Sequence, residues 1–307
     1  MKKNCFLFVA FLSMLLNVSA QQNIEGRIMV NATARDYVLH LPSHIDKNKP
    51  LPLVFIFHGG GGNSKQMQRY MGMDAIADKE NFITVYPQGL NKQWNDGRAF
   101  NESIAANDDV KFIDQLLDTL EKNEPVDPKR VFATGISNGA FFSIYLSYKL
   151  SQRFLAIAPV CGSIPQKLYD QFFPSQPVSL LLINGTGDPL VPYNGGTVGN
   201  RLIGNRGECV STDKTIDRFI SVDKTSATSS IEDLPNGNKW DGCTAIQYRY
   251  SNGKDNSKVI LIKIINGGHT LPGGSQYLPK MIVGRVCRDF NANEKIWEFF
   301  KSCPDRN

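Results

Sequence analysis

The sequence predicts an α/β fold in which a mostly parallel central sheet carries helices on both faces. Continuous apolar runs recur along the chain, and such runs are typical of strands buried on both faces. Segments with apolar residues at helical spacing separate most of these runs. Strands that alternate with helices form a parallel sheet, because each crossover helix packs back against it. The predicted buried strands are 51–57, 82–86, 131–134, 154–160, 178–184 and 259–265.

The remaining elements follow in chain order. Residues 27–31 and 36–41 alternate between polar and apolar side chains, which predicts two antiparallel strands ahead of the first buried strand. Ser64 is placed to cap one helix, and Asn107 or Asp108 to cap another. The predicted helices are 64–79, 108–123, 138–150, 212–220 and 291–300.

Residues 1–20 have the features of a secretory signal peptide. Two lysines precede an apolar stretch over residues 5–16, and a small-residue cleavage site follows at 18–20. We therefore expect a mature chain that begins near Gln21 and is exported to the periplasm or the extracellular space. No later apolar run is long enough to span a bilayer.

The mature chain, residues 21–307, is expected to form a single domain. It has no repeat, low-complexity block or proline-rich linker, and its length suits one large core. The segment 193–240 is polar and weakly periodic, and we interpret it as an insertion over the active site. Removing the two signal-peptide lysines lowers the formal charge from +5 to +3. This surplus is too small to indicate binding to nucleic acid.

The mature chain contains five cysteines, which are Cys161, Cys209, Cys243, Cys287 and Cys303. Export permits disulfides, and an odd count leaves at least one thiol outside any intrachain pair. Cys287 and Cys303 flank the last predicted helix, which would hold them about 18 Å apart. The preferred pair is Cys209 with Cys243, and the other pairings stay open.

The pentapeptide Gly135-Ile136-Ser137-Asn138-Gly139 matches the G-x-S-x-G nucleophile elbow of the α/β-hydrolase fold. A strand turns sharply into a helix there, and the glycines leave room for the exposed serine. The motif is weak by itself, but here it joins a predicted strand to a predicted helix. This context favours Ser137 as a nucleophile over a turn with only a structural role.

His269 is the only histidine that follows Ser137 in the sequence. The base comes last in the α/β-hydrolase order, so elimination leaves His269 as the candidate. It follows the predicted strand 259–265 in a glycine loop, Asn266-Gly267-Gly268-His269. An isolated histidine is more often structural, but this position favours a catalytic base.

Asp188 is the preferred acid, because it follows the predicted strand 178–184 directly. Functional groups of open α/β sheets gather at the carboxyl ends of strands. An aspartate before a proline also starts ordinary turns, which is the structural alternative. Asp213, Asp217 and Glu208 are weaker candidates, since nothing places them at a strand end.

Two backbone N–H groups are expected to form an oxyanion hole. Asn138, directly after the nucleophile, supplies one, and Gly60 or Gly61 supplies the other. The glycine run follows a buried strand and His58, a placement that suits close approach of the backbone to a substrate. We expect His58 itself to pack structurally and not to act as a second base.

No metal site and no cofactor are predicted. The sequence has no H-E-x-x-H, no C-x-x-C, no P-loop and no dinucleotide-binding fingerprint. Cys161 lacks an elbow and is interpreted as a small buried residue. Asp108 and Asp109 start a helix, where capping is favoured over catalysis.

Several motifs spread over nearly all of the mature chain belong together. They are residues 58–63, Tyr86-Pro87-Gln88-Gly89, Trp94-Asn95, Asp108-Asp109-Val110, residues 135–140, Gly187-Asp188 and Gly268-His269-Thr270-Leu271-Pro272-Gly273. The set resembles the secreted esterases grouped as polyhydroxybutyrate depolymerase-like and as feruloyl or acetylxylan esterases of carbohydrate esterase family 1. The resemblance implies an α/β-hydrolase with Ser137, Asp188 and His269 as catalytic triad and no cofactor. It also implies short-chain or hydroxycinnamoyl esters of plant polysaccharides, or polyester, as substrates.

Two positions bear on specificity. Relatives often carry Trp where this chain has Leu271, so an aromatic wall is lost and aromatic acyl groups are less firmly implied. Trp94 lies in the loop after the predicted strand 82–86 and is a candidate for stacking on the substrate. The alternative is an indole that fills the base of that loop.

Together these residues predict an exported serine carboxylesterase that hydrolyses feruloyl or acetyl esters on plant polysaccharide through an acyl-enzyme. The alternatives are a polyhydroxyalkanoate or polyester depolymerase, a peptidase, and a non-catalytic binding protein on a hydrolase scaffold. The preferred acyl group and alcohol stay open, because the shape of the pocket depends on how residues 193–240 fold.

Overall fold

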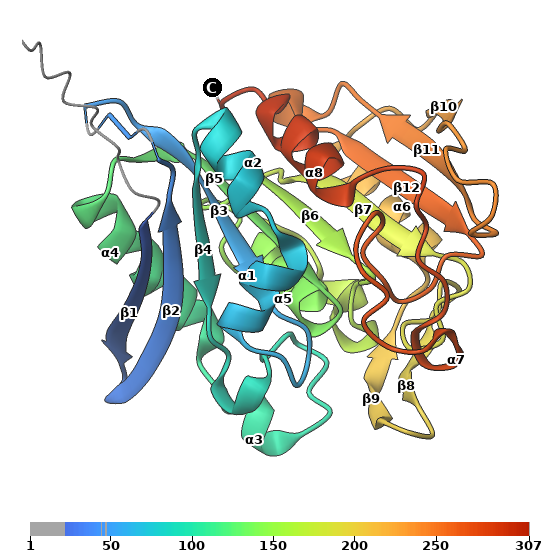
Figure 1. Ribbon diagram of the computed structural model, residues 1–307, viewed down its shortest axis with the longest axis horizontal. Helices are drawn as coiled ribbons and strands as arrows, with labels where there is room; N and C mark the ends of the chain where they lie inside the picture. Colours follow the sequence, from blue (N-terminus) through green and yellow to red (C-terminus); the bar gives the residue numbers. More distant parts are fainter. Residues whose placement is uncertain (1–21, 44, 47, 307) are drawn as a thin grey trace, which may run out of the picture.

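A ten-stranded sheet forms the centre of the described part of the chain, which comprises residues 22–43, 45–46 and 48–306 of a computed structural model (Figure 1). Its strands are β1 (Gln22–Val30), β2 (Thr33–Leu41), β3 (Leu51–Phe57), β4 (Ile83–Pro87), β5 (Val126–Ile136), β6 (Ala156–Val160), β7 (Ser179–Gly185), β10 (Ser230–Asp233), β11 (Thr244–Tyr250) and β12 (Val259–Ile265). Their order is β1-β2-β4-β3-β5-β6-β7-β12-β11-β10.

The centre of the sheet is parallel and its edges are antiparallel. Strands β4, β3, β5, β6, β7 and β12 run in the same direction. At one edge β2 pairs antiparallel with β4, and β1 pairs antiparallel with β2. At the other edge β11 pairs antiparallel with β12, and β10 pairs antiparallel with β11. The predicted fold class, an α/β-hydrolase with a mostly parallel sheet, is therefore confirmed.

Helices cover both faces of the sheet. The helices of the described chain are α1 (Ser64–Met71), α2 (Asp74–Glu80), α3 (Glu102–Ala105), α4 (Asp109–Asn123), α5 (Asn138–Lys149), α6 (Thr212–Asp223), α7 (Lys280–Val283) and α8 (Ala292–Lys301), with short 3-10 turns at Leu90–Lys92, Gln166–Gln171 and Lys254–Asn256; α3 and α7 lie in loops beyond the strand ends. Alternate residues of β3 face opposite layers. Val54 and Ile56 join the core under α1, α2 and α8, whereas Phe55 and Phe57 join the core under α4, α5 and α6. In Figure 1 the first layer lies in front of the sheet.

The predicted helix 64–79 is two helices in the structure. Gly72 adopts a left-handed backbone with φ 63° and ends α1, and its N–H donates to the carbonyl of Gln68. Helix α2 then starts at Asp74. The prediction of one continuous helix was wrong, because a glycine at the C-cap stops a helix whose apolar spacing continues beyond it.

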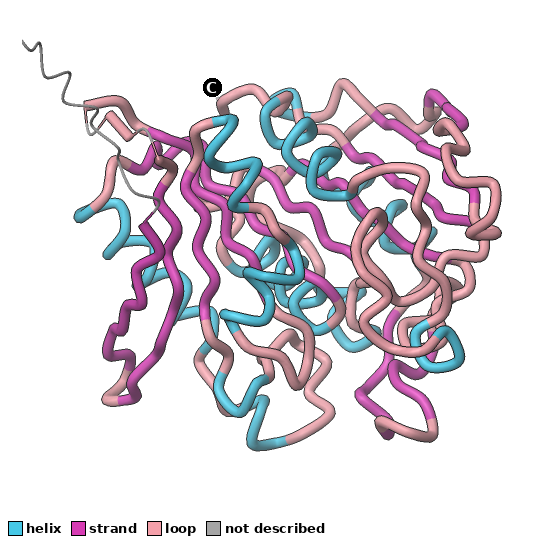
Figure 2. Tube along the Cα trace, in the orientation of Figure 1, coloured by secondary structure: helices cyan, strands magenta, loops and turns pink. Residues whose placement is uncertain are grey.

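The segment 193–240 divides into three parts. Strands β8 (Gly196–Asn200) and β9 (Gly204–Cys209) form a separate hairpin, which projects beyond the sheet at the lower right of Figure 2. Helix α6 packs against β7 and β12, and β10 extends the sheet edge. Only the hairpin part reaches the pocket described below, so the interpretation of the whole segment as an insertion over the active site needs correction.

Both aspartates at the start of α4 have structural roles. The Asp108 side chain accepts a hydrogen bond from the backbone N–H of Lys111, as an N-cap does. Asp109 is buried and forms an ion pair with Arg35, with 2.5 Å between the atoms, and it also accepts the N–H of Asn95. The Asp109 carboxylate therefore connects α4 to β2 and to the loop that follows β4.

The five cysteines of the described chain are buried and none forms a disulfide. Cys209 packs against Phe141, Val191 and Val198. The thiol of Cys243 instead makes a hydrogen bond with that of Cys287. The preferred pair, Cys209 with Cys243, is therefore wrong, because the two residues join different apolar clusters.

The predicted signal peptide, residues 1–20, lies outside the described residues. None of the helices in the described part of the chain combines the length and the apolar character that crossing a bilayer requires.

Replacing Asp223 with Asn is expected to stabilise the protein at neutral and alkaline pH. Asp223 ends α6 in a buried position, one carboxyl oxygen accepts the N–H of Val178, and the other has no hydrogen-bond partner. Burial raises the pKa of the Asp223 carboxyl to about 8. The folded state therefore holds a proton that the unfolded state releases, and stability falls as the pH rises towards 8.

We expect Asp223→Asn to raise the free energy of unfolding by about 1–3 kcal/mol at pH 8 and by much less at pH 4. Urea unfolding at both pH values measures the difference. Asp217→Asn, at an exposed position of the same helix, is the matched control. An Asp223→Asn effect that does not change between pH 4 and pH 8 would contradict the explanation.

Oxidised glutathione is expected to join Cys243 to Cys287, because their thiols are already in contact. Each thiol loses its proton, the two sulfur atoms become bonded, and one glutathione disulfide is reduced to two thiols. Mass spectrometry of peptides from the unreduced protein should find this pair. Cys287→Ser should remove the linked peptide and Cys209→Ser should keep it. A bridge between Cys209 and Cys243 is the result that contradicts this prediction.

Candidate active site

Ser137 lies on a sharp turn between β5 and α5. Its backbone has φ 58° and ψ −121°, and its N–H donates to the carbonyl of Val160 on the neighbouring strand. A positive φ strains a non-glycine residue by about 1–3 kcal/mol, and such strain persists only where the surroundings enforce it. The turn has the conformation expected of a nucleophile elbow, and the Ser137 side chain lines a pocket.

The glycines of the elbow are required by the approach of α5 to β3. A Cβ atom on Gly139 would collide with the backbone carbonyl of Phe57, and one on Gly135 would lie 2.7 Å from that same oxygen. Real Cβ atoms do not come so close to backbone oxygen atoms. The two glycines therefore let the first turn of the helix lie directly against the end of the central strand.

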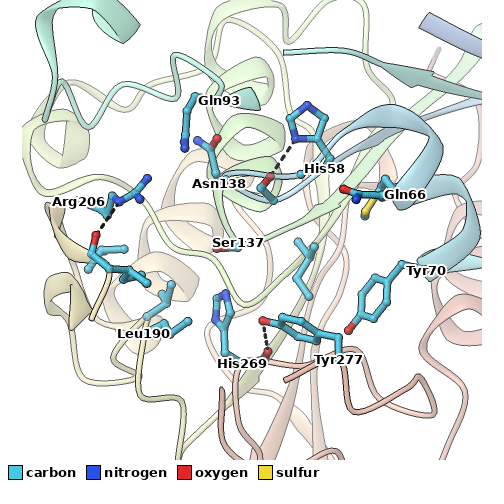
Figure 3. A pocket seen from close by; sticks show the side chains of 18 of the residues that line it. His58, Gln66, Tyr70, Gln93, Ser137, Asn138, Leu190, Arg206, His269 and Tyr277 are labelled. Carbon is cyan, nitrogen blue, oxygen red and sulfur yellow. Dashed lines mark hydrogen bonds between the residues drawn. The ribbon is translucent and has the colours of Figure 1, made fainter. Parts of the chain in front are cut away.

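His269 and Asp188 form a buried hydrogen-bonded pair. His269 Nδ1 lies 2.7 Å from Asp188 Oδ2, and the two side chains are 3% and 2% exposed. The other carboxylate oxygen of Asp188 accepts the N–H groups of Leu190 and Val191, both at 2.8 Å. With Asp188 accepting at Nδ1, the imidazole keeps its Nε2 for the pocket that it shares with Ser137 (Figure 3).

The loop around His269 is held from two sides. The N–H of Gly268 donates to Arg285 and that of His269 to Val283, both in the segment at and after α7. The hydroxyl of Tyr277 donates to the carbonyl of His269 at 3.1 Å. These bonds fix the backbone that carries the imidazole, separately from the contact between the ring and Asp188.

Cys161 packs under this loop, with its sulfur 3.6 Å from the carbonyl oxygen of Thr270. Burial raises the pKa of the Cys161 thiol well above its usual range. A thiol held in its protonated form is a poor nucleophile and a poor metal ligand. The interpretation of Cys161 as a small buried residue agrees with these contacts.

Of the two glycines predicted for the oxyanion hole, only Gly60 lines the pocket. The N–H of Gly61 is already bonded to the carbonyl of Lys92 at 2.8 Å, and Gly61 does not line the pocket. Its assignment to the oxyanion hole was therefore wrong. Gly60 lines the pocket, and so does Asn138, whose N–H belongs to the first turn of α5. N–H groups of a first helical turn have no partner within the helix.

The Asn138 side chain faces away from this role. Its amide nitrogen donates to the Trp94 carbonyl and to Asp96, and its amide oxygen accepts the Trp94 N–H. Asp96 in turn forms a buried ion pair with Arg98. The first residue of α5 is thereby fixed to the loop after β4.

Trp94 is not a substrate-stacking residue. Its side chain is fully buried, its indole N–H donates to the carbonyl of His58 at 3.0 Å, and its ring stacks on Phe142 with 4.9 Å between centroids. Trp94 fills the base of the loop, which was the alternative interpretation. Sequence position places the residue near the site but does not show on which side of the backbone its ring lies.

His58 has the structural role that the sequence predicts. Its Nε2 accepts the N–H of Gly89 and its Nδ1 donates to the carbonyl of Gly59. Burial lowers the pKa of His58 to about 4. The imidazole is therefore neutral near pH 7 and supports the glycine loop.

The pocket above Ser137 has a volume of about 500 Å³ and contains residues that the sequence did not indicate. Tyr70 and Tyr277 lie edge to face with 5.5 Å between ring centroids, and both line it. Gln93 and Arg206 line it as well. Leu271 is buried and does not line the pocket, so the aromatic wall comes from the tyrosines instead. No sequence motif marks these positions.

Two clusters of the described chain bring potential metal-ligating atoms within 4.8 Å of one another: Cys161 with Asp188 and His269, and Asp241 with Cys287 and Asp289. Hydrogen bonds explain both clusters. The first is the pair described above with its neighbouring thiol. In the second, both carboxylates accept backbone N–H groups, Asp241 from Arg288 and Asp289 from Asn238.

Comparisons with known proteins show which family the chain belongs to. An esterase family model, described as "Putative esterase", matches residues 32–205, more than half of the chain. "Putative esterase NocK" of Nocardia uniformis subsp. tsuyamanensis is 26% identical over 279 residues, which cover 89% of this chain and 80% of that protein. "Feruloyl esterase C" of Emericella nidulans is 32% identical over 186 residues, which cover 58% of this chain and 64% of that protein.

This chain therefore spans less than two thirds of the length of that feruloyl esterase. The solved structure of an acetyl xylan esterase from Aspergillus awamori superposes with a TM-score of 0.60 at 13% identity, covering 91% of this chain and 99% of that chain. At this identity the likeness concerns the fold. The family model spans Ser137, Asp188 and the strands that carry them, and the chain therefore belongs to this esterase family.

Proposed function

We propose that the protein is a serine esterase with Ser137, Asp188 and His269 as its catalytic triad. The observation that carries the proposal is the 2.7 Å bond between His269 Nδ1 and Asp188 Oδ2, in the pocket that the strained Ser137 lines. Asp188 holds the imidazole in one tautomer, so that Nε2 accepts the Ser137 proton. Membership of an esterase family makes a non-catalytic binding role the weaker alternative.

The reaction proceeds in two halves. The Ser137 oxygen bonds to the ester carbonyl carbon, and the N–H groups of Asn138 and Gly60 stabilise the oxyanion. The ester C–O bond then breaks, and the leaving alcohol takes its proton from His269. Water, deprotonated by His269, attacks the acyl-enzyme and releases the carboxylic acid with regeneration of Ser137.

The proposed substrates are feruloyl or acetyl esters on plant polysaccharide. The name of the Emericella nidulans relative supports the feruloyl group, and the motifs around Ser137 and His269 resemble those of both kinds of esterase. The Tyr70 and Tyr277 rings supply an aromatic wall suited to a hydroxycinnamoyl ring. Export, proposed from residues 1–20, would bring the protein to such polymers.

A polyester depolymerase is the second candidate, and the observation that favours it is the apolar rim of the pocket. Ile203, Tyr277 and Leu278 line the pocket and are each about 40% exposed. An apolar rim of this kind would contact a hydrophobic polymer.

Ser137→Ala is expected to abolish the turnover of p-nitrophenyl acetate, because the elbow carries no other nucleophilic side chain. The circular dichroism spectrum should stay unchanged, since alanine is smaller and keeps the backbone. Ser143→Ala, a buried serine of α5 whose hydroxyl bonds to the Gly139 carbonyl, is a matched control that should retain activity. Turnover by Ser137→Ala that equals the wild-type rate would refute the triad.

Release of ferulate and acetate from arabinoxylan, measured beside hydrolysis of polyhydroxybutyrate films, separates the proposed substrates. We expect ferulate or acetate release that disappears in Ser137→Ala, and slower film hydrolysis. Film hydrolysis without release of either acid from arabinoxylan would favour the depolymerase instead.

A further inference from the structure

The pocket has two chemically different sides, which lie on either side of Ser137 in Figure 3. Tyr70 and Tyr277 form the aromatic side. Gln93 and Arg206 lie across the pocket from these rings and come from the loop after β4 and from strand β9. An ester has an acyl part and an alcohol part, and this pocket would place one part beside the tyrosine rings and the other beside Gln93 and Arg206.

Arg206 brings a positive charge that no described carboxylate neutralises. Its Nε donates to the carbonyl of Ile203 at 3.2 Å, and within the described chain no Asp or Glu oxygen lies within 4.0 Å of its guanidinium. No Asp or Glu of the described chain lines the pocket. Arg98, the other lining arginine, is already paired with the buried Asp96.

Gln93 adds an unsatisfied polar atom beside the oxyanion donor. Its Oε1 is buried and has no hydrogen-bond partner. It lies so near Gly60 that a Cβ atom added there would be 2.9 Å away. A buried amide oxygen without a partner is costly, and a hydroxyl or N–H of a ligand would relieve that cost. This side of the pocket is therefore suited to a group with both hydroxyls and a negative charge.

We propose that Arg206 binds a carboxylate carried by the substrate while Gln93 Oε1 accepts a substrate hydroxyl beside it, so that the protein prefers anionic esters to neutral ones. Arginine suits this task, because its planar guanidinium stays charged and matches the geometry of a carboxylate. The proposal rests on the esterase function proposed above. The carboxylate has two chemical sources, a second acid group on the acyl part or a uronic acid in the polysaccharide.

The first experiment compares two esters that differ only at the end of the acyl chain. Mono-p-nitrophenyl adipate ends in a carboxylate, whereas p-nitrophenyl hexanoate ends in a methyl group. The second compares acetylated glucuronoxylan with the same polymer after carbodiimide-mediated reduction of its uronic acids. In each experiment the quantity is the ratio of kcat/KM for the anionic substrate to that for its neutral counterpart.

Arg206→Gln should lower this ratio about five- to tenfold for one of the two pairs, because a charge-assisted hydrogen bond is lost. Arg206→Lys, which keeps the charge, should lower it less. Arg201→Gln makes the same charge change on the exposed turn of the hairpin, outside the pocket, and should leave the ratio unchanged. The wild-type preference should also weaken in 0.5 M salt, since Arg206 is partly exposed.

The pair of substrates that responds identifies the source of the carboxylate. Equal wild-type rates on both members of both pairs would overturn the proposal. So would an Arg201→Gln effect as large as that of Arg206→Gln, because the cause would then be the overall charge. A wild-type protein that hydrolyses none of the esters would refute the esterase function itself, which keeps the two failures distinct.

Discussion

The site depends on the parallel pairing of β7 with β12. Asp188 and His269 are 81 positions apart in the sequence, yet they follow neighbouring strands that point the same way. Parallel strands end at a common edge, so the loops that follow them meet there. The hydrogen bond between Asp188 and His269 follows from this pairing, and the segment at and after α7 supports the same loop from the other side.

A second set of contacts positions the oxyanion side. The loop after β4 is tied to α4 by Asp109 and to α5 by the side chain of Asn138. Trp94 fills the space beneath it and bonds to the carbonyl of His58. Polar groups that are buried and fully bonded hold a backbone in one position. The N–H groups proposed to stabilise the oxyanion therefore belong to a preorganised loop and helix terminus.

The errors of the sequence predictions have a common cause, which is that a local pattern reports neither the direction of a side chain nor its contacts with distant segments. The helix over 64–79 kept its apolar spacing through Gly72, where the chain in fact turns. Trp94 was placed correctly in the loop near the site, but its ring points into the core. In the glycine run, contacts with a distant segment decide which N–H group is free to bind a substrate. The N–H of Gly61 is not free, because it donates to the carbonyl of Lys92.

The sequence by itself determined the fold class, the position of the nucleophile elbow and, by elimination, His269 as the candidate base. These follow from local pattern and from the order of residues along the chain. The tertiary structure alone decided which side chains surround Ser137. Tyr70, Tyr277, Gln93 and Arg206 come from four separate segments and carry no shared motif. The shape and charge of a pocket depend on how distant loops pack over the sheet edge, and no local pattern encodes that packing.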